Sequence, residues 1–201
     1  MRIVITNKKG GVGKTPIAFS IAKDLDYSLI SNDDSVIEEI YAKAIITNKP
    51  EILEQAVYDF GGFADKNVLK IAKDSLVVIP VTKSSNALLR TIYTIREFQD
   101  IAHKIIIIGA QHKNMKQYLH IQAEIQKEFP KIEIYPLRHA EIFDQIIDYG
   151  LSVNEIADES KLIAYNSRNI IQEYNTILKR IKDVIKEESW FTPTNRKNRD
   201  E

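Results

Sequence analysis

The sequence predicts an α/β fold in which helices flank a doubly wound, mostly parallel sheet. Four short runs rich in β-branched residues alternate with segments of helical periodicity. This alternation favours right-handed βαβ crossovers between parallel strands. A turn rich in glycine and lysine also stands between the first run and the first helix, where such sheets bind their ligands.

The predicted strands are apolar enough to be buried on both faces of a sheet. The clear strands are residues 2–6, 76–81, 104–109 and 131–135, and the weaker ones are residues 27–31 and 55–60. Helical spacing covers residues 16–25, 86–101 and 115–129, and the stretch 36–45 also suggests a helix.

A long C-terminal helix is predicted from Leu162 to Lys186. Apolar residues recur there at a period close to 3.6, which gives one stripe that faces the core. No segment that resembles a linker separates this helix from the sheet. We therefore expect a single domain over residues 1–188 and a flexible C-terminal tail over residues 189–201, which is rich in polar and charged residues.

Composition excludes several classes of function. Lysine plus arginine and aspartate plus glutamate number 28 each, so bulk charge gives no argument for a nucleic-acid partner. The absence of cysteine excludes disulfides, thiolate zinc sites and cysteine-held iron–sulfur clusters. The four histidines lack a metal-binding spacing, and no segment is apolar enough to span a bilayer. We expect a cytoplasmic protein without a membrane partner.

The loop GGVGKT, residues 10–15, is typical of a phosphate-binding loop because it links a strand to a helix. Its backbone N–H groups and the helix N-terminus would surround phosphate oxygens. Lys14 would bridge the β- and γ-phosphates, and the Thr15 hydroxyl would bind Mg²⁺. The alternative, a flexible turn without a ligand, requires that all six specified positions arise by chance.

The stretch KGGVGKT, residues 9–15, resembles the deviant P-loop of the ParA/MinD family of partition and positioning ATPases. The extra lysine of that family corresponds to Lys9. The resemblance implies a P-loop NTPase fold, ATP and Mg²⁺ as cofactors, and an ATP-dependent homodimer in which Lys9 reaches the phosphates bound to the other copy. It assigns nucleotide contacts to Lys9, Gly10, Gly11, Val12, Gly13, Lys14, Thr15 and Pro16.

The same resemblance places two switch segments. Asp33 corresponds to the aspartate that positions the attacking water, which makes Lys9, Lys14 and Asp33 the catalytic candidates. From the residues alone, Asp33, Asp34 or Ser35 could instead cap the helix that follows. Asp59 lies at a strand end and would hold Mg²⁺ through water, while Gly61 or Gly62 would let the second switch sense the γ-phosphate.

The resemblance also places Pro136, Leu137 and Arg138 along the base. After the strand at 104–109, the family often has an asparagine that reads adenine, whereas this chain has AQHKN. The expectation of ATP therefore rests on the loop and not on an adenine-reading residue. Pro16 replaces the usual hydroxyl residue and lacks an N–H group for the α-phosphate. We therefore expect weaker nucleotide binding than a threonine would give.

Three lysines of the predicted C-terminal helix share one face and could bind DNA without sequence preference: Lys179, Lys182 and Lys186. The alternative is an ordinary solvated helix face, diluted by neighbouring acidic residues.

Together these features predict an ATPase switch that dimerises on Mg²⁺-ATP, binds DNA and the nucleoid, and hydrolyses ATP slowly. A small centromere-binding protein would stimulate hydrolysis during plasmid or chromosome segregation. One alternative is an accessory ATPase of conjugation or cargo positioning with the same switch. Another is a P-loop ligase or kinase of small molecules, which would need a second cluster of polar residues for its substrate.

Overall fold

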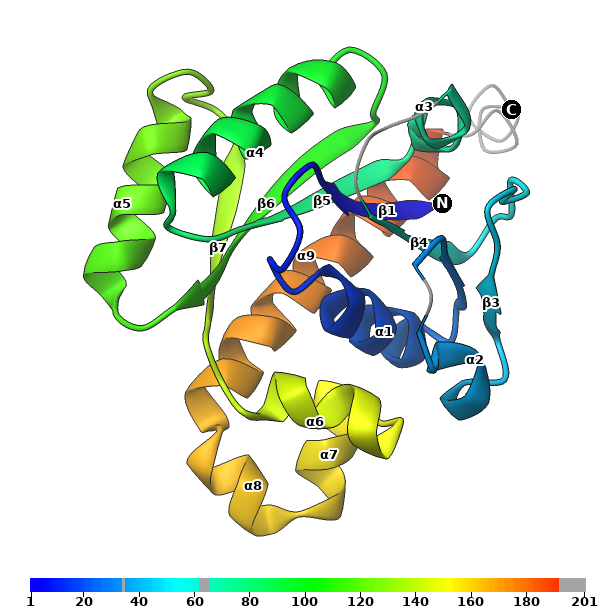
Figure 1. The fold of residues 1–201 in the computed structure, drawn as a ribbon, viewed down its shortest axis with the longest axis vertical. Coiled ribbons are helices and arrows are strands. Elements are labelled where there is room, and N and C mark those ends of the chain that lie inside the picture. The colour runs from blue at the N-terminus through cyan, green and yellow to red at the C-terminus, as the bar shows by residue number, and fades with distance from the viewer. Residues whose placement is uncertain (34, 62–65, 192–201) are drawn as a thin grey trace, which may run out of the picture.

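Seven parallel strands form one sheet in the part of the chain that the structure describes (Figure 1). The structure is a computed structural model that describes residues 1–33, 35–61 and 66–191. The strands are β1 Ile3–Asn7, β2 Ser28–Ser31, β3 Ala44–Ile46, β4 Ala56–Gly61, β5 Leu76–Val81, β6 Lys104–His112 and β7 Glu133–Arg138. Their order across the sheet is β3-β2-β4-β1-β5-β6-β7. The expected doubly wound sheet is confirmed, and it is parallel throughout.

Helices cover both faces of the sheet (Figure 1). They are α1 Lys14–Leu25, α2 Ile37–Ile40, α3 Lys66–Ala72, α4 Ser85–Phe98, α5 Met115–Gln126, α6 Ile142–Tyr149, α7 Val153–Glu159, α8 Lys161–Asn166 and α9 Arg168–Phe191. Helices α1, α6, α7 and α9 contribute to the core on one face, and α3, α4 and α5 contribute to the core on the other. Each face therefore has its own apolar cluster, as a doubly wound sheet requires.

The centre of the sheet positions the loop that follows β1. All five residues of β1 are buried, because β4 pairs with one edge of this strand and β5 with the other. The chain crosses to β2 through α1 on one face, and it crosses from β4 to β5 through α3 on the opposite face. The carboxyl end of β1 therefore lies at the crevice where doubly wound sheets bind ligands.

The C-terminal helix differs from its prediction. It is broken at Ser167, whose backbone N–H donates to the Ile163 carbonyl while its own carbonyl accepts from Ile170 and Ile171. The break lets α8 pack against α7 while α9 packs along β7. The predicted stripe is buried or packed against the core, and α9 continues to Phe191, three residues beyond the expected domain boundary. Residues 192–201 of the expected tail lie outside the described residues.

The predicted helix at residues 36–45 is mostly wrong. Only Ile37–Ile40 are helical, and Ala44–Ile46 form the edge strand β3 beside β2. The Tyr41 hydroxyl donates to the Tyr27 carbonyl at 2.6 Å, and the Ala44 N–H donates to the Tyr41 carbonyl. These bonds turn the chain back along β2, so tertiary pairing overrides the helical pattern.

Candidate functional site

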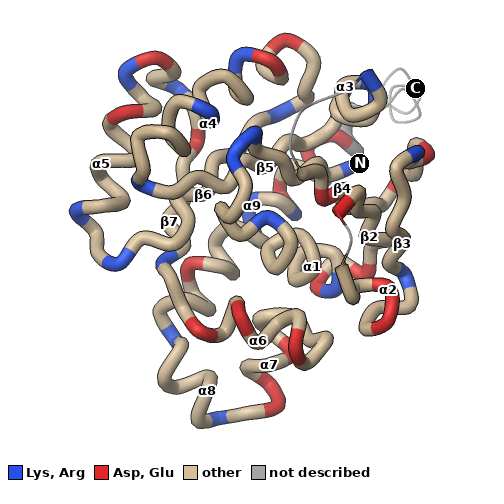
Figure 2. Tube along the Cα trace, viewed as in Figure 1, with Lys and Arg blue, Asp and Glu red and all other residues tan. Residues whose placement is uncertain are grey.

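The loop between β1 and α1 has the backbone of an anion-binding site. Gly11 and Gly13 have φ angles of 70° and 83°, in the left-handed region that favours glycine. Gly13 precedes α1, and no side chain caps the first turn of this helix. The N–H groups of that turn have no partner within the helix, so they can donate to a phosphate. Figure 2 shows lysines along this loop and at the start of α1.

Lys14 and Asp59 bring opposite charges to this loop without pairing in the described chain. The Lys14 side chain is buried, and no carboxylate of the described residues lies within ion-pair distance of its ammonium group. Asp59, at the end of the neighbouring β4, is 0 % exposed, and neither of its carboxylate oxygens has a hydrogen-bond partner among the described residues. Buried charges without partners are energetically unfavourable and mark candidate functional sites.

The surroundings of Asp59 fit a divalent cation. Burial raises the pKa of its carboxyl to about 6, and the nearby Asp33 acts in the same direction. The nearby Thr15 hydroxyl and Lys14 ammonium lower this pKa, although the Thr15 hydroxyl does not form a hydrogen bond to the carboxylate. A carboxylate and a hydroxyl beside a loop that can bind an anion are oxygen ligands that suit Mg²⁺. The described residues contain no cluster of three His, Cys, Asp or Glu side chains that could hold a metal without a phosphate.

The two predicted switch segments meet at the carboxyl ends of β2 and β4. A Cβ atom at Gly61 would lie 2.7 Å from Asp33 Oδ1, so a larger residue would displace this carboxylate. The Gly61 N–H donates to Asn32 Oδ1 at 2.9 Å. Asp33 does not cap a helix, because Val36 precedes α2 and no side chain of the described residues caps it. Gly62 and Asp34 lie outside the described residues.

Lys9 lies on the same loop with a half-buried side chain. Its backbone N–H donates to Asn7 Oδ1 at 2.9 Å, whereas its ammonium has no ion pair within the described chain. The neighbouring Lys8 is different, because its ammonium lies 3.0 Å from the Glu97 carboxylate of α4. Of the two adjacent lysines, Lys9 is therefore the one whose charge has no partner among the described residues.

A narrow hollow of about 70 Å³ lies beside the loop between β1 and α1. Gly13 and Pro16 line one side of it, and Leu137, Arg138 and Phe143 line another. Pro136 lies elsewhere, in a hollow that faces α9. The Arg138 guanidinium is held by the Glu173 carboxylate of α9, with Nε and Oε1 2.9 Å apart. Of the three predicted base contacts, Leu137 and Arg138 line the hollow beside the loop, and Leu137 also belongs to the apolar core that α1 shares.

Gln111 also lines the narrow hollow, although the sequence did not predict it as a site residue. Its φ angle of 56° turns the chain at the end of β6, where the amide nitrogen of its side chain lies 3.4 Å from a Cβ built on Gly13. Asn114, the asparagine nearest to the expected position, instead accepts a hydrogen bond from the Gln117 N–H and caps α5. The stretch AQHKN indicated that this region differs from the family pattern. It did not predict that the backbone of Gln111 would adopt a left-handed conformation.

Comparisons with known proteins point to one group of ATPases. No protein-family model and no curated protein matches the sequence. Among solved structures, an ATP complex of a Cyanothece McdA variant is 14 % identical, with a TM-score of 0.62 over 90 % of this chain and 96 % of that one. The structural neighbours are ParA/MinD-family ATPases over about nine-tenths of this chain. The chain has the ParA/MinD fold.

Two further neighbours carry the same fold with a partner protein or with a nucleotide. MinD in the Aquifex aeolicus MinC:MinD complex is 18 % identical, with a TM-score of 0.56 over 89 % of this chain and 95 % of that one. MinD of Pyrococcus horikoshii, solved with Mg-ADP, is 9 % identical, with a TM-score of 0.55 over 88 % of this chain and 95 % of that one. At these identities the comparisons establish the ParA/MinD fold and leave the activity to be argued from the site.

The predicted DNA-binding lysines lie on α9, away from the loop of this ParA/MinD fold. Lys179, Lys182 and Lys186 are all exposed. The Lys179 ammonium lies 2.9 Å from Asp183, which offsets part of the local charge. Among the ion pairs between described residues, none involves Lys182. The face therefore offers positive charge, but less than three free lysines would give.

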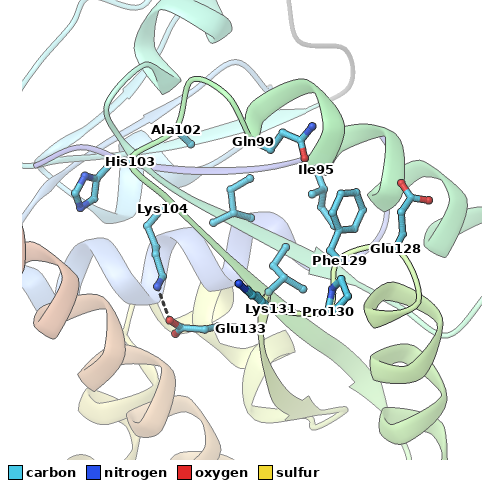
Figure 3. A pocket seen from close by; sticks show the side chains of 12 residues that line it. Ile95, Gln99, Ala102, His103, Lys104, Glu128, Phe129, Pro130, Lys131 and Glu133 are labelled. Carbon is cyan, nitrogen blue, oxygen red and sulfur yellow. Dashed lines mark ion pairs between the residues drawn. The ribbon is translucent and has the colours of Figure 1, made fainter.

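A larger hollow of about 530 Å³ lies at the opposite, amino end of the sheet (Figure 3). Ile95, Ile105 and Phe129 contribute apolar surface, and the Lys104–Glu133 ion pair closes one side. Glu133 also accepts from Arg180 Nε at 2.8 Å. The charge of Glu133 is compensated, in contrast to that of Asp59.

No helix in the described ranges is long and apolar enough to cross a membrane.

Proposed function

We propose that the protein is an ATPase switch that binds Mg²⁺-ATP at the loop between β1 and α1 and then self-associates. The observation that carries this proposal is the pair of buried charges, Lys14 and Asp59, beside a glycine-rich helix N-terminus. Neither charge has a partner in the part of the chain that the structure describes. A triphosphate with its cation would supply both missing partners. The ParA/MinD fold, which includes ATP and Mg-ADP complexes among its solved members, supports this nucleotide.

Each residue of the site has a distinct task in the proposed reaction. The backbone of residues 10–15 and the Lys14 ammonium would bind the phosphates, while Thr15 and Asp59 would hold Mg²⁺, Asp59 through water. Bound Mg²⁺ would offset negative charge that develops between the β- and γ-phosphates. Asp33 would orient a water molecule that attacks the γ-phosphorus, and the bond to the β-γ bridging oxygen would break.

Lys9 favours a switch over a simple monomeric ATPase. Its ammonium has no partner in the described chain, although the loop backbone at this residue is fixed by a hydrogen bond. In the proposed dimer it would reach the phosphates bound to the second copy, so the site would be complete only after association. Catalysis would then be slow in the monomer, because the loops assemble fully only in the dimer.

DNA segregation is the biological role that we propose for this switch. A partner protein would accelerate hydrolysis, and the exposed lysines of α9 would contact DNA phosphates in a salt-dependent way. Cargo positioning or DNA transfer would use the same switch with another client. A small-molecule kinase has less support, because the larger hollow lies at the amino end of the sheet, far from the proposed phosphate site.

Sedimentation velocity with Mg²⁺ and a non-hydrolysable ATP analogue tests the proposal. We expect a monomer without nucleotide, a dimer with the analogue, and a faster species when arbitrary duplex DNA is added. The Lys9→Ala variant should bind the analogue but associate much more weakly, with a dimer only at high protein concentration. A chain that binds the analogue and stays monomeric would contradict the switch, and a dimer indifferent to DNA would contradict the role in segregation.

A further inference from the structure

Asn7, the last residue of β1, is a buried polar residue that none of the roles above uses. Its side chain is 0 % exposed. Asn7 Nδ2 donates to the Pro80 carbonyl at 2.7 Å and to Thr91 Oγ1 at 2.8 Å, and Asn7 Oδ1 accepts from the Lys9 N–H at 2.9 Å. Both amide protons and one oxygen lone pair are therefore used. The side chain joins the loop to β5 and to α4 at once.

The sheet opens at the point where Asn7 lies. The pairing of β1 with β5 runs from Ile3 and Leu76 to Ile5 and Val78, whereas β1 pairs with β4 as far as Asn7 and Gly61. Pro80 lies beyond the last β1–β5 pair and has no N–H group to donate. The Asn7 amide binds the Pro80 carbonyl in place of a backbone donor. This bond holds the two strands together at the base of the loop.

Helix α4 presents a polar stripe to the same stretch of chain. Thr91, Thr94 and Glu97 are spaced by three residues, so they lie on neighbouring turns of one helix face. Thr91 accepts from Asn7 Nδ2, Thr94 Oγ1 accepts from the Lys8 N–H at 3.4 Å, and Glu97 pairs with the Lys8 ammonium at 3.0 Å. Both threonines are fully buried, which makes loss of these partners unfavourable.

We propose that Asn7, supported by Thr91 of α4, is a positioning residue for Lys9. This inference rests on the proposed function, in which Lys9 completes the site of a second copy. Asn7 fixes the backbone nitrogen of Lys9, while Lys8 is occupied by Glu97 and is unavailable for the same task. The direction in which the Lys9 side chain leaves the loop is thereby set before a second copy arrives. Association then loses less conformational entropy than it would with a mobile loop.

A purely structural role makes a different prediction from a positioning role. If Asn7 served only to satisfy Pro80 and Thr91, its removal would lower stability and would affect every property of the loop alike. If it acts through Lys9, its removal should matter for association only while Lys9 is present. Residues that act through one another give non-additive effects in a double-mutant cycle.

The test is a double-mutant cycle with Asn7→Ala, Lys9→Ala and the double variant. Association is measured by sedimentation with Mg²⁺ and a non-hydrolysable ATP analogue, and monomer affinity is measured with a fluorescent ATP analogue. We expect Asn7→Ala to weaken association about tenfold or more, and to weaken it by less than about threefold when Lys9 is already alanine. The affinity of the monomer for the fluorescent analogue should change by less than about threefold.

Two further sets of variants separate positioning from loss of stability. Thr91→Val should weaken association as Asn7→Ala does, and Thr91→Ser, which keeps the hydroxyl, should restore it. Ser75→Ala removes a buried hydroxyl that donates to the Ile71 carbonyl at the amino end of the sheet, and it should leave association unchanged. Unfolding midpoints of all variants are compared so that association is measured where each is folded.

The outcomes distinguish this inference from the function on which it rests. Additive losses in the cycle, equal behaviour of Thr91→Val and Thr91→Ser, or association of Asn7→Ala as strong as that of the unchanged protein would overturn the positioning role alone. An unchanged chain that binds nucleotide without associating would overturn the proposed switch and the positioning role together.

Discussion

The two ends of the sheet treat charge in opposite ways. At the amino end, Glu133 lies between Lys104 and Arg180, and the Met1 amino group lies 3.3 Å from Glu54 and 3.6 Å from Glu188. At the carboxyl end, Lys14 and Asp59 are buried and have no partner in the described chain. Paired charges of the first kind support the fold, whereas unpaired charges of the second kind reduce stability unless a ligand completes them.

The comparison predicts that removal of an unpaired cation affects binding and spares the fold. Lys14→Met keeps the aliphatic stem and removes the ammonium group. We expect at least about a 100-fold loss of ATP affinity by calorimetry, because a charge-assisted contact to phosphate is lost in a buried site. The melting temperature without nucleotide should stay the same or rise.

Lys23→Met is the matched control on the same helix. Its ammonium lies 2.7 Å from Glu155 and 2.6 Å from the Gly150 carbonyl, so its charge is paired. This variant should lose stability and keep its ATP affinity. If Lys14→Met and Lys23→Met lost ATP affinity to the same extent, or lost stability to the same extent, the contrast between unpaired and paired charges would be contradicted.

Asp59→Asn should stabilise the nucleotide-free protein. Burial raises the pKa of this carboxyl to about 6 from an ordinary value of 3.8, so the folded state holds a proton more tightly than the unfolded state. Ionisation therefore reduces stability as the pH rises from about 4 to 6. At pH 7.5 we expect a gain of about 1–3 kcal/mol in urea unfolding, with loss of Mg²⁺-dependent hydrolysis.

Asp24→Asn provides the opposite case. Its carboxylate accepts from Ser152 Oγ at 2.6 Å, from Asn154 Nδ2 at 2.8 Å and from Tyr174 Oη at 2.7 Å. Because this carboxylate is satisfied, we expect the amide to reduce stability. A loss of stability in Asp59→Asn comparable to that in Asp24→Asn would show that Asp59 is not held in an unfavourable state.

Glu133→Gln should destabilise the protein in a pH-dependent way. Hydrogen bonds from Arg180, and further ones from Lys104 and Tyr135, lower the pKa of this carboxyl to about 2 from an ordinary 4.5. The stabilisation is therefore present above about pH 4.5 and disappears as the pH falls towards 2. We expect a loss of about 1–2 kcal/mol at pH 7, after screening by solvent, that shrinks towards pH 3.

Glu128→Gln is the control for the rim of the same hollow. Its partner Arg96 is exposed, with Nε 2.7 Å from Oε1, so the pair should contribute less than about 1 kcal/mol. Urea unfolding at pH 7 and pH 3 compares the two variants. A constant difference between Glu133→Gln and the unchanged protein at both values would contradict the assigned cause.

Local signals in the sequence predicted the fold class and the glycine-rich turn between β1 and α1. Buried strands such as β1 and β5 are continuous apolar runs, and the glycines of the loop reflect backbone angles that favour this residue. The edge strand β3 was missed because a run of three residues carries no clear period, and its pairing with β2 decides its structure.

The parts of the site that depend on distant contacts could not be predicted. The Asn7 side chain forms hydrogen bonds to residues 73 and 84 positions further along the chain, and no local sequence pattern predicts partners at such distances. Gln111 reaches the loop through a left-handed turn that is unusual for a residue other than glycine. Arg138 was expected along the base, but its guanidinium is held by Glu173 of a helix thirty-five positions later. These contacts follow from topology and not from residue type.

The smallest expected effect concerns Pro16, in the first turn of α1 beside the narrow hollow. Proline is tolerated there because the N–H groups of this turn have no partner within the helix, but it removes one donor from the proposed phosphate site. Pro16→Thr should raise ATP affinity by roughly twofold to tenfold in calorimetry, the gain from about one hydrogen bond. Pro16→Ala restores the N–H without a hydroxyl and should give a similar gain if the backbone donor is the cause. A gain in Pro16→Thr alone would assign the effect to the hydroxyl, and no gain in either would show that this end of the loop does not contact the phosphates.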